Sequence, residues 1–150
     1  MNNHEHDHSH CEEHHHHHHC DETEEDLYGE LNEVPAVFSY TESFEIGKEV
    51  KGDKLQESFV HWIEGLRKWA VENKHFIGHI KIFVKDEKDF NLWAVTTGKK
   101  INVKTFSENN DYDIKNITVN MTAIVFGTDE ETLKSVVLKK LDEELLCYMN

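Results

Sequence analysis

The sequence predicts an α+β fold, an antiparallel-rich sheet of about five strands with two helices packed on one face, in the order β-α-β-β-β-β-α. Two observations lead to this prediction. Two segments place apolar residues at spacings of three and four, as helices do, and five segments alternate apolar and polar residues, as strands do. The regular pattern begins at Val34-Pro35, which includes the only proline of the chain. The chain length of 150 residues suits one ordinary domain.

The first predicted strand covers residues 36–46 (AVFSYTESFEI), which partly alternate and are rich in aromatic residues. A helix is predicted to follow, with Asp53 as its N-cap, Gln56 at the third helical position and an end near Asn73. Its apolar residues recur at helical spacing: Leu55, Phe59, Trp62, Ile63, Leu66, Trp69 and Ala70.

Four more strands are predicted. Residues 79–86 (HIKIFVKD) alternate cleanly, with Ile80, Ile82 and Val84 toward the core. Residues 90–97 and 100–106 form two strands joined at Gly98-Lys99, a hairpin turn. Residues 113–127 form a long strand, whose core face consists of Ile117, Val119, Met121, Ala123 and Val125.

The last helix has the clearest start, because Thr128 and Glu131 have the spacing of a capping box. Its apolar stripe consists of Leu133, Val136, Val137, Leu141 and Leu145. Cys147 continues this face, so we expect it to be a small buried thiol rather than a metal ligand.

The charge of −14 belongs mainly to an N-terminal leader, residues 1–33, while residues 34–150 form what we call the body. The leader holds eleven Asp and Glu and no Lys or Arg, whereas the body holds nineteen acidic and sixteen basic residues. Since an acidic leader repels phosphate and no basic patch with interleaved aromatics appears, we expect no nucleic-acid binding. The leader has too few large apolar side chains to offset chain entropy, so we expect it to be disordered without ligand.

The chain has three cysteines, a small and odd number, which argues against a disulfide framework. We find no basic segment followed by an apolar one at the N-terminus, and no apolar run near the ~20 residues that span a bilayer. A cytoplasmic protein that does not enter membranes is therefore expected.

Ten of the thirteen histidines lie within the first twenty residues. Neutral imidazole binds the later divalent first-row metals, and thiolate suits zinc. Because the ligands form many equivalent sets rather than one fixed spacing, we expect several overlapping, exchanging sites for zinc, nickel or cobalt and no catalytic centre. The predicted ligands are His4, His6, His8, His10, Cys11, His14, His15, His16, His17, His18, His19 and Cys20.

Two other interpretations of the leader stay open. A run of six histidines, residues 14–19, has the length of an affinity tag, although a tag usually sits at a terminus beside small residues. The leader can also be a solvated tract that binds no metal.

The body resembles the C-terminal domain of the CobW-type family of metal-handling GTPases, in which a His- and Asp-rich segment commonly precedes that domain. The similar segments are FSYTESFEIG, FIGHIKIFV and IVFGTDEETLKSVVLKKL, within about residues 36–146. In the last segment Phe126-Gly127, Asp129, Glu130 and Leu133 match best. The resemblance implies an accessory domain of a GTP-dependent metallochaperone or cobalamin-biosynthesis factor.

The family's GTPase motifs are missing from this chain. A P-loop needs G-x-x-x-x-G-K-[ST], but Lys100 follows Gly98-Lys99 and Glu49 follows Gly47-Lys48. The family's C-x-C-C metal motif is also absent. We therefore expect no enzyme and transfer no catalytic residues, which leaves a stand-alone counterpart of the C-terminal half.

Within the body the candidates are weaker. His75 and His79 bracket the turn after the first helix and could form a metal pair, and His75 near a helix end is suited to a structural cationic role. Lys81, Phe83 and Lys85 could form a face for a protein partner or a plain solvated surface.

The leading hypothesis is a non-enzymatic metal-binding accessory protein that buffers or delivers zinc, nickel or cobalt. Its partner would be a separately encoded CobW-type GTPase or a metal-requiring target protein. The alternative is an interaction or regulatory module that partners a P-loop GTPase, with an incidental leader. A third hypothesis, an enzyme acting on a corrin or other small molecule, would require a deep pocket with convergent polar groups.

Overall fold

A computed structural model describes residues 34–107 and 111–149. In this part of the chain the elements follow the predicted order β-α-β-β-β-β-α. The strands are β1 (Ala36–Glu45), β2 (Phe76–Asp86), β3 (Asn91–Thr96), β4 (Ile101–Phe106) and β5 (Asn116–Phe126). The helices are α2 (Gly52–Glu72), α3 (Glu130–Leu145) and the short 3₁₀ helix η1 (Leu146–Tyr148).

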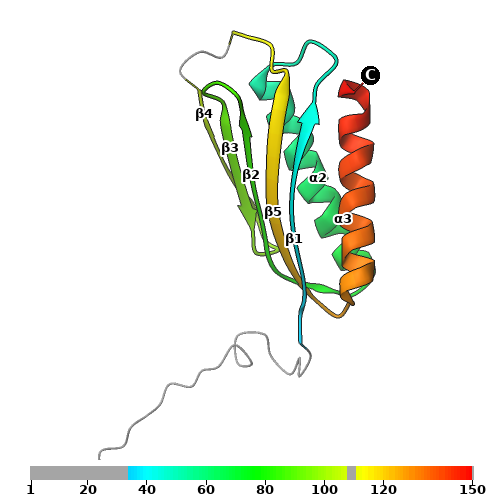
Figure 1. The fold of residues 1–150 in the computed structure, drawn as a ribbon. Helices are drawn as coiled ribbons and strands as arrows, with labels where there is room; N and C mark the ends of the chain where they lie inside the picture. Colours follow the sequence, from blue (N-terminus) through cyan, green and yellow to red (C-terminus); the bar gives the residue numbers. More distant parts are fainter. Residues whose placement is uncertain (1–33, 108–110, 150) are drawn as a thin grey trace, which may run out of the picture. The chain divides into compact units, whose positions relative to one another are not determined.

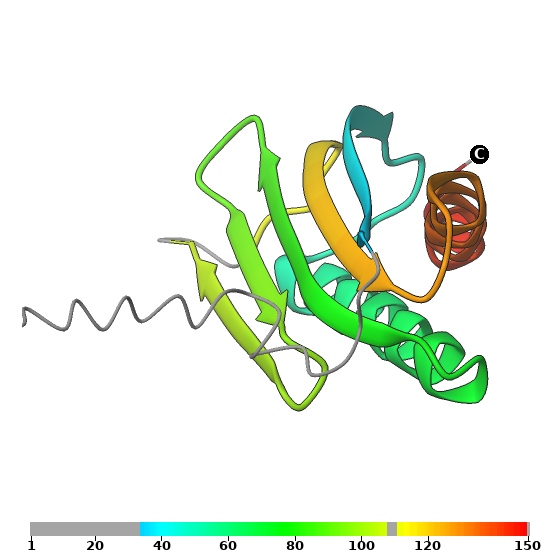
Figure 2. The same ribbon diagram turned by 90° about the horizontal axis from the view of Figure 1, so that it is seen from below.

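The five strands form one sheet in the order β1-β5-β2-β3-β4, and every neighbouring pair is antiparallel. Both helices lie against the same face of the sheet, α3 beside β1 and α2 behind the middle strands (Figures 1 and 2). No helix of the described residues lies over the other face. The predicted fold class is confirmed.

The core fills the space between this sheet and the two helices. The predicted inward faces of the second and fifth strands are confirmed, because Ile82 and Val119 are fully buried and their neighbours at alternate positions are buried with them. Trp62 of α2 is also buried, and its indole N–H donates a hydrogen bond of 3.2 Å to the carbonyl of Val137 on α3. This bond joins the two helices within the apolar layer.

Both predicted helix caps are wrong by one or two residues. Helix α2 begins at Gly52 after an extended Lys51, so Asp53 lies inside the first turn, where its carboxylate accepts from the Lys54 N–H. Helix α3 is capped by Asp129 and not Thr128, because the Asp129 carboxylate accepts the Thr132 N–H at 2.7 Å.

Two further expectations are corrected. Strand β2 begins at Phe76, three residues before the predicted start. The prediction missed these residues because a β-bulge between Ile77 and His79 interrupts the alternation of apolar and polar side chains. Cys147 is exposed rather than buried. Since α3 ends at Leu145 and the chain tightens into η1, Tyr148 occupies the inward position instead.

The hairpin predicted at Gly98-Lys99 joins β3 to β4, and Gly98 has φ +101°, a conformation that favours glycine. Strand β4 is the last strand on its side of the sheet, and four of its six residues are exposed. No helix in the described ranges is long and apolar enough to cross a bilayer.

Candidate functional site

The twelve predicted metal ligands of the leader all lie outside the residues that the structure describes, so this site stays a prediction. Within residues 34–107 and 111–149, no group of three or more His, Cys, Asp or Glu side chains is placed to hold a metal ion. The described part of the body therefore supplies no complete metal site of its own.

His61 joins the two helices. Its Nδ1 contacts the Oε1 of Glu144, so that a side chain of α2 is paired with one of α3. His61 is well exposed, whereas Glu144 is largely covered. Within the described ranges, this contact is a pair of side chains that connects α2 to α3.

His75 and His79 are both half-buried, on either side of the bulge that opens β2. The ring of His75 packs against Trp69 with centroids 4.9 Å apart, and its backbone N–H donates to the carbonyl of Ala70 at 2.7 Å. A metal held by His75 and His79 would lack a third protein ligand from the described chain. The cationic role predicted for His75 stays a prediction.

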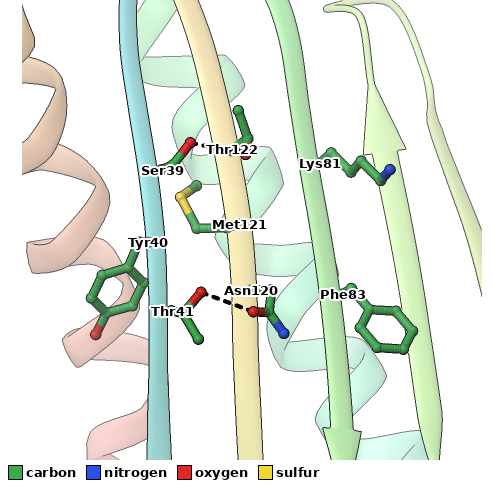
Figure 3. A pocket seen from close by; sticks show the side chains of 8 residues that line it. All are labelled: Ser39, Tyr40, Thr41, Lys81, Phe83, Asn120, Met121 and Thr122. Carbon is green, nitrogen blue, oxygen red and sulfur yellow. Dashed lines mark hydrogen bonds between the residues drawn. The ribbon is translucent and has the colours of Figure 1, made fainter.

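The uncovered face of the sheet carries a ladder of polar side chains between β1 and β5 (Figure 3). Ser39 pairs with Thr122 at 3.1 Å, the Thr41 hydroxyl donates to Asn120 Oδ1 at 2.8 Å, and the ladder continues at Ser43. These groups satisfy one another across a non-core surface.

A shallow hollow of about 390 Å³ lies on this polar face, where Lys81 and Phe83 of β2 border the ladder. Lys81 is the only charged residue in its lining. The lining lacks the base beside a nucleophile that covalent catalysis needs, and it lacks paired carboxylates for acid–base catalysis. The hollow is thus a polar surface of the described sheet.

A cluster of two carboxylates and a phenol closes the connection between β2 and β3. The Tyr112 hydroxyl lies 2.7 Å from Asp86 Oδ2 and 3.0 Å from Asp89 Oδ1, and the Phe90 N–H donates to Asp86 Oδ1 at 3.0 Å. Partial burial and hydrogen bonds to Asp86 and Asp89 raise the pKa of Tyr112. The phenol therefore stays protonated and acts as a structural donor, which sequence reasoning missed because the partners are far apart in the chain.

Two cavities lie between α2 and the β3–β4 hairpin. One, of about 210 Å³, adjoins the start of β4 and is mainly apolar, with Val71, Phe76 and Lys99 in its lining. The other, of about 200 Å³, adjoins the end of β4 at Thr105 and reaches the first turn of α2. Neither cavity could be predicted from the sequence, because both depend on how α2 lies along the sheet.

Arg67 fixes the hairpin at the first of these cavities. Its Nη1 lies 3.0 Å from both carboxylate oxygens of Glu64, and its Nη2 donates to the carbonyls of Gly98 and Lys99. The side chain therefore uses its charge to hold the β3–β4 turn against α2.

No family model matches the chain, and no curated protein matches it either. Two solved structures are similar to it: the Zn(II)-bound YjiA GTPase from E. coli and a Zn(II)-bound triple mutant of the YjiA GTPase. Each aligns at 12% identity and a TM-score of 0.40, over 69% of this chain and 29% of that chain. The chain therefore spans less than a third of the length of the GTPase that it matches.

Proposed function

We propose that the protein is a non-enzymatic metal-binding accessory protein. The leader collects zinc, nickel or cobalt as cargo, for buffering or for delivery. The body recognises the recipient, which is a separately encoded CobW-type GTPase or another protein that requires the metal.

The observation that carries the proposal is the ligand density of the leader. Ten of thirteen histidines and two of three cysteines fall within the first twenty residues, among carboxylates that raise the local concentration of cations. Redundant imidazoles allow an ion to exchange between neighbouring sets, which suits collection and hand-off. A permanent structural site would instead need four ligands at fixed positions.

The body supports a recognition role rather than a chemical one. Among the described residues, the polar hollow beside Lys81 is lined partly by side chains that bond one another, and the two carboxylates near Tyr112 accept hydrogen bonds from its hydroxyl. The motifs that resemble the C-terminal domain of CobW-type proteins agree with an accessory role.

The experiment compares metal binding by two variants of the full chain. In the first, the ten leader histidines are replaced by Gln and Cys11 and Cys20 by Ser. In the matched control, only the body histidines His61, His75 and His79 are replaced by Gln. Zn²⁺, Ni²⁺ and Co²⁺ are added separately, bound metal is measured by equilibrium dialysis near neutral pH, and circular dichroism verifies that both variants are folded.

We expect the leader variant to lose nearly all bound metal, since imidazole and thiolate are the ligands these ions prefer. The control should keep the capacity of the unaltered chain. Equal binding by the unaltered chain and the leader variant would refute the proposal, and loss in the control would place the ions in the body.

A second candidate function is an interaction or regulatory module for which the leader is incidental. The uncovered sheet face and the exposed strand β4 favour a surface for a protein partner. This function predicts that a partner binds the leader variant as well as the unaltered chain, and that a chelator has no effect on binding.

A further inference from the structure

Among the described strands, β4 is an edge of the sheet, with a neighbour on one side only. It is the outermost strand beside β3, and four of its residues are exposed, including Phe106 at 60%. The opposite edge differs, because α3 runs alongside β1 (Figures 1 and 2). An edge strand offers unpaired backbone donors and acceptors, which a further extended segment can use.

The surroundings of β4 provide side-chain seats as well. The apolar cavity at Val71 and Phe76 lies at the β3–β4 turn, just before the start of β4. A more polar cavity, with Asp53 and Gln56 in its lining, adjoins the end of β4 at Thr105. Val71 at this apolar cavity is 76% exposed, so its side chain is accessible to an added strand. Because side chains of an added strand alternate between faces, every second one would point toward these cavities.

The charge of this edge is opposite to that of the chain. Residues 98–107 hold three lysines, Lys99, Lys100 and Lys104, and no acidic residue, within a protein of net charge −14. Among the described residues, Lys99 and Lys100 form no ion pair, and Lys104 lies over the ring of Trp93, 5.8 Å from its centroid. In the part of the chain that the structure describes, two of the three charges therefore have no ion-pair partner.

We propose that β4 is a docking strand for an extended acidic segment of a partner protein, which adds a sixth strand to the sheet. Its acidic side chains lie toward Lys99, Lys100 and Lys104, and its apolar side chains enter the apolar cavity at Val71 and Phe76. A second copy of this chain is a poor occupant, because its own three lysines would be brought against these.

This inference rests on the proposed function only in that the body recognises a partner. It does not require metal in the leader, so the test is made with a chelator present. Failure of metal capture and failure of strand docking are then separate results.

The probe is a fluorescein-labelled peptide of four Glu-Val repeats, whose alternation places Glu on one face and Val on the other. One control peptide carries Lys in place of Glu, and a second carries Pro in place of every other Val, which removes backbone donors. Binding to the full chain is measured by fluorescence polarisation. The triple variant K99E/K100E/K104E is compared with K48E/K134E/K139E, which makes the same charge change on residues outside β4 and its hairpin.

We expect saturable binding of the Glu-Val peptide and protection of the amides of Ile101–Phe106 from hydrogen exchange. The triple variant K99E/K100E/K104E should bind about tenfold or more weakly, and the control triple variant should lose less than about twofold in affinity. Both control peptides should fail to bind. Equal binding by the two triple variants would overturn the proposal, as would protection at β1 instead of β4, no binding up to about 1 mM peptide, or a dimer that itself protects β4.

Discussion

The hydroxyl oxygens of Ser58 and Tyr148 lie 2.5 Å apart, in a buried position where α2 meets η1. The carbonyl of Tyr148 also accepts the Gly47 N–H at 2.8 Å, so the last turn of the described chain is held from two directions. A residue two positions from the end of the chain thereby becomes part of the core.

The Ser58–Tyr148 hydrogen bond predicts a test of coupling between the first helix and the C-terminal turn. Tyr148→Phe should lower the free energy of unfolding by about 1–3 kcal/mol, because the Ser58 hydroxyl is left buried without its partner. Adding Ser58→Ala to it should cost little more, since the orphaned hydroxyl is then gone. Urea denaturation of the single and double variants measures the coupling, and purely additive losses would show that the bond contributes nothing.

Two glycines of α2 are predicted to respond oppositely to alanine. A Cβ at Gly52 would lie 2.5 Å from the buried ring of Phe90, so Gly52→Ala should destabilise the protein by about 1–3 kcal/mol. At Gly65 the nearest atom, on Lys140, is 3.7 Å away, and Gly65→Ala should stabilise by about 0.5–1 kcal/mol through helix propensity. Thermal and urea unfolding of both variants give the signs, and a loss at Gly65 would contradict this explanation.

The faces of the strands and helices were predictable because burial has a simple period. Ile82 and Val119 sit at alternate positions of strands buried on one side, and Leu141 follows the three-to-four spacing of a helix with one buried face. These patterns depend only on which side of an element meets the core. The order of elements then followed from the succession of patterns along the chain.

The ends of the elements were predicted less well, because neighbours in space decide them. Helix α2 starts at Gly52, which fits against Phe90, rather than after the better capping residue Asp53. Cys147 fits the apolar period of α3, but a change to 3₁₀ geometry turns it outward and brings Tyr148 in. Neither the fit of Gly52 against Phe90 nor the burial of Tyr148 can be predicted from a short window of sequence.

The two proposed sites, the metal-binding leader and the docking strand β4, also differ in how far the sequence alone predicts them. The metal-binding leader is proposed from composition, since redundant ligands need no particular fold. The docking strand depends on β4 being an edge, and strand order is a property of the folded sheet. Its lysines were present in the sequence, yet nothing local indicated that they lie beside open backbone groups.

Asp129 predicts a specific loss of stability in acid. Hydrogen bonds from the backbone N–H and the hydroxyl of Thr132 hold the pKa of this carboxyl below its ordinary value of 3.8. Its stabilising contribution is therefore complete above pH 3.8 and is lost as the pH falls through the lower pKa of the folded state. Asp129→Asn keeps a cap that does not titrate, so its unfolding free energy should change less with pH across this window. Identical pH profiles of the two proteins, measured by urea denaturation, would contradict the assignment.

The last prediction concerns the pH at which the leader releases metal. An imidazole binds a metal ion only when neutral, and its ordinary pKa is about 6.5. Bound Zn²⁺ should therefore be nearly complete at about pH 7.5 and mostly lost at about pH 5, with the midpoint set by competition between protons and metal. Equilibrium dialysis across this range gives the curve, and the variant without leader histidines and cysteines should bind little at every pH. If the curve instead rose mainly between about pH 7 and 9, thiolates of Cys11 and Cys20 would be the controlling ligands, because an ordinary thiol has a pKa of about 8.5.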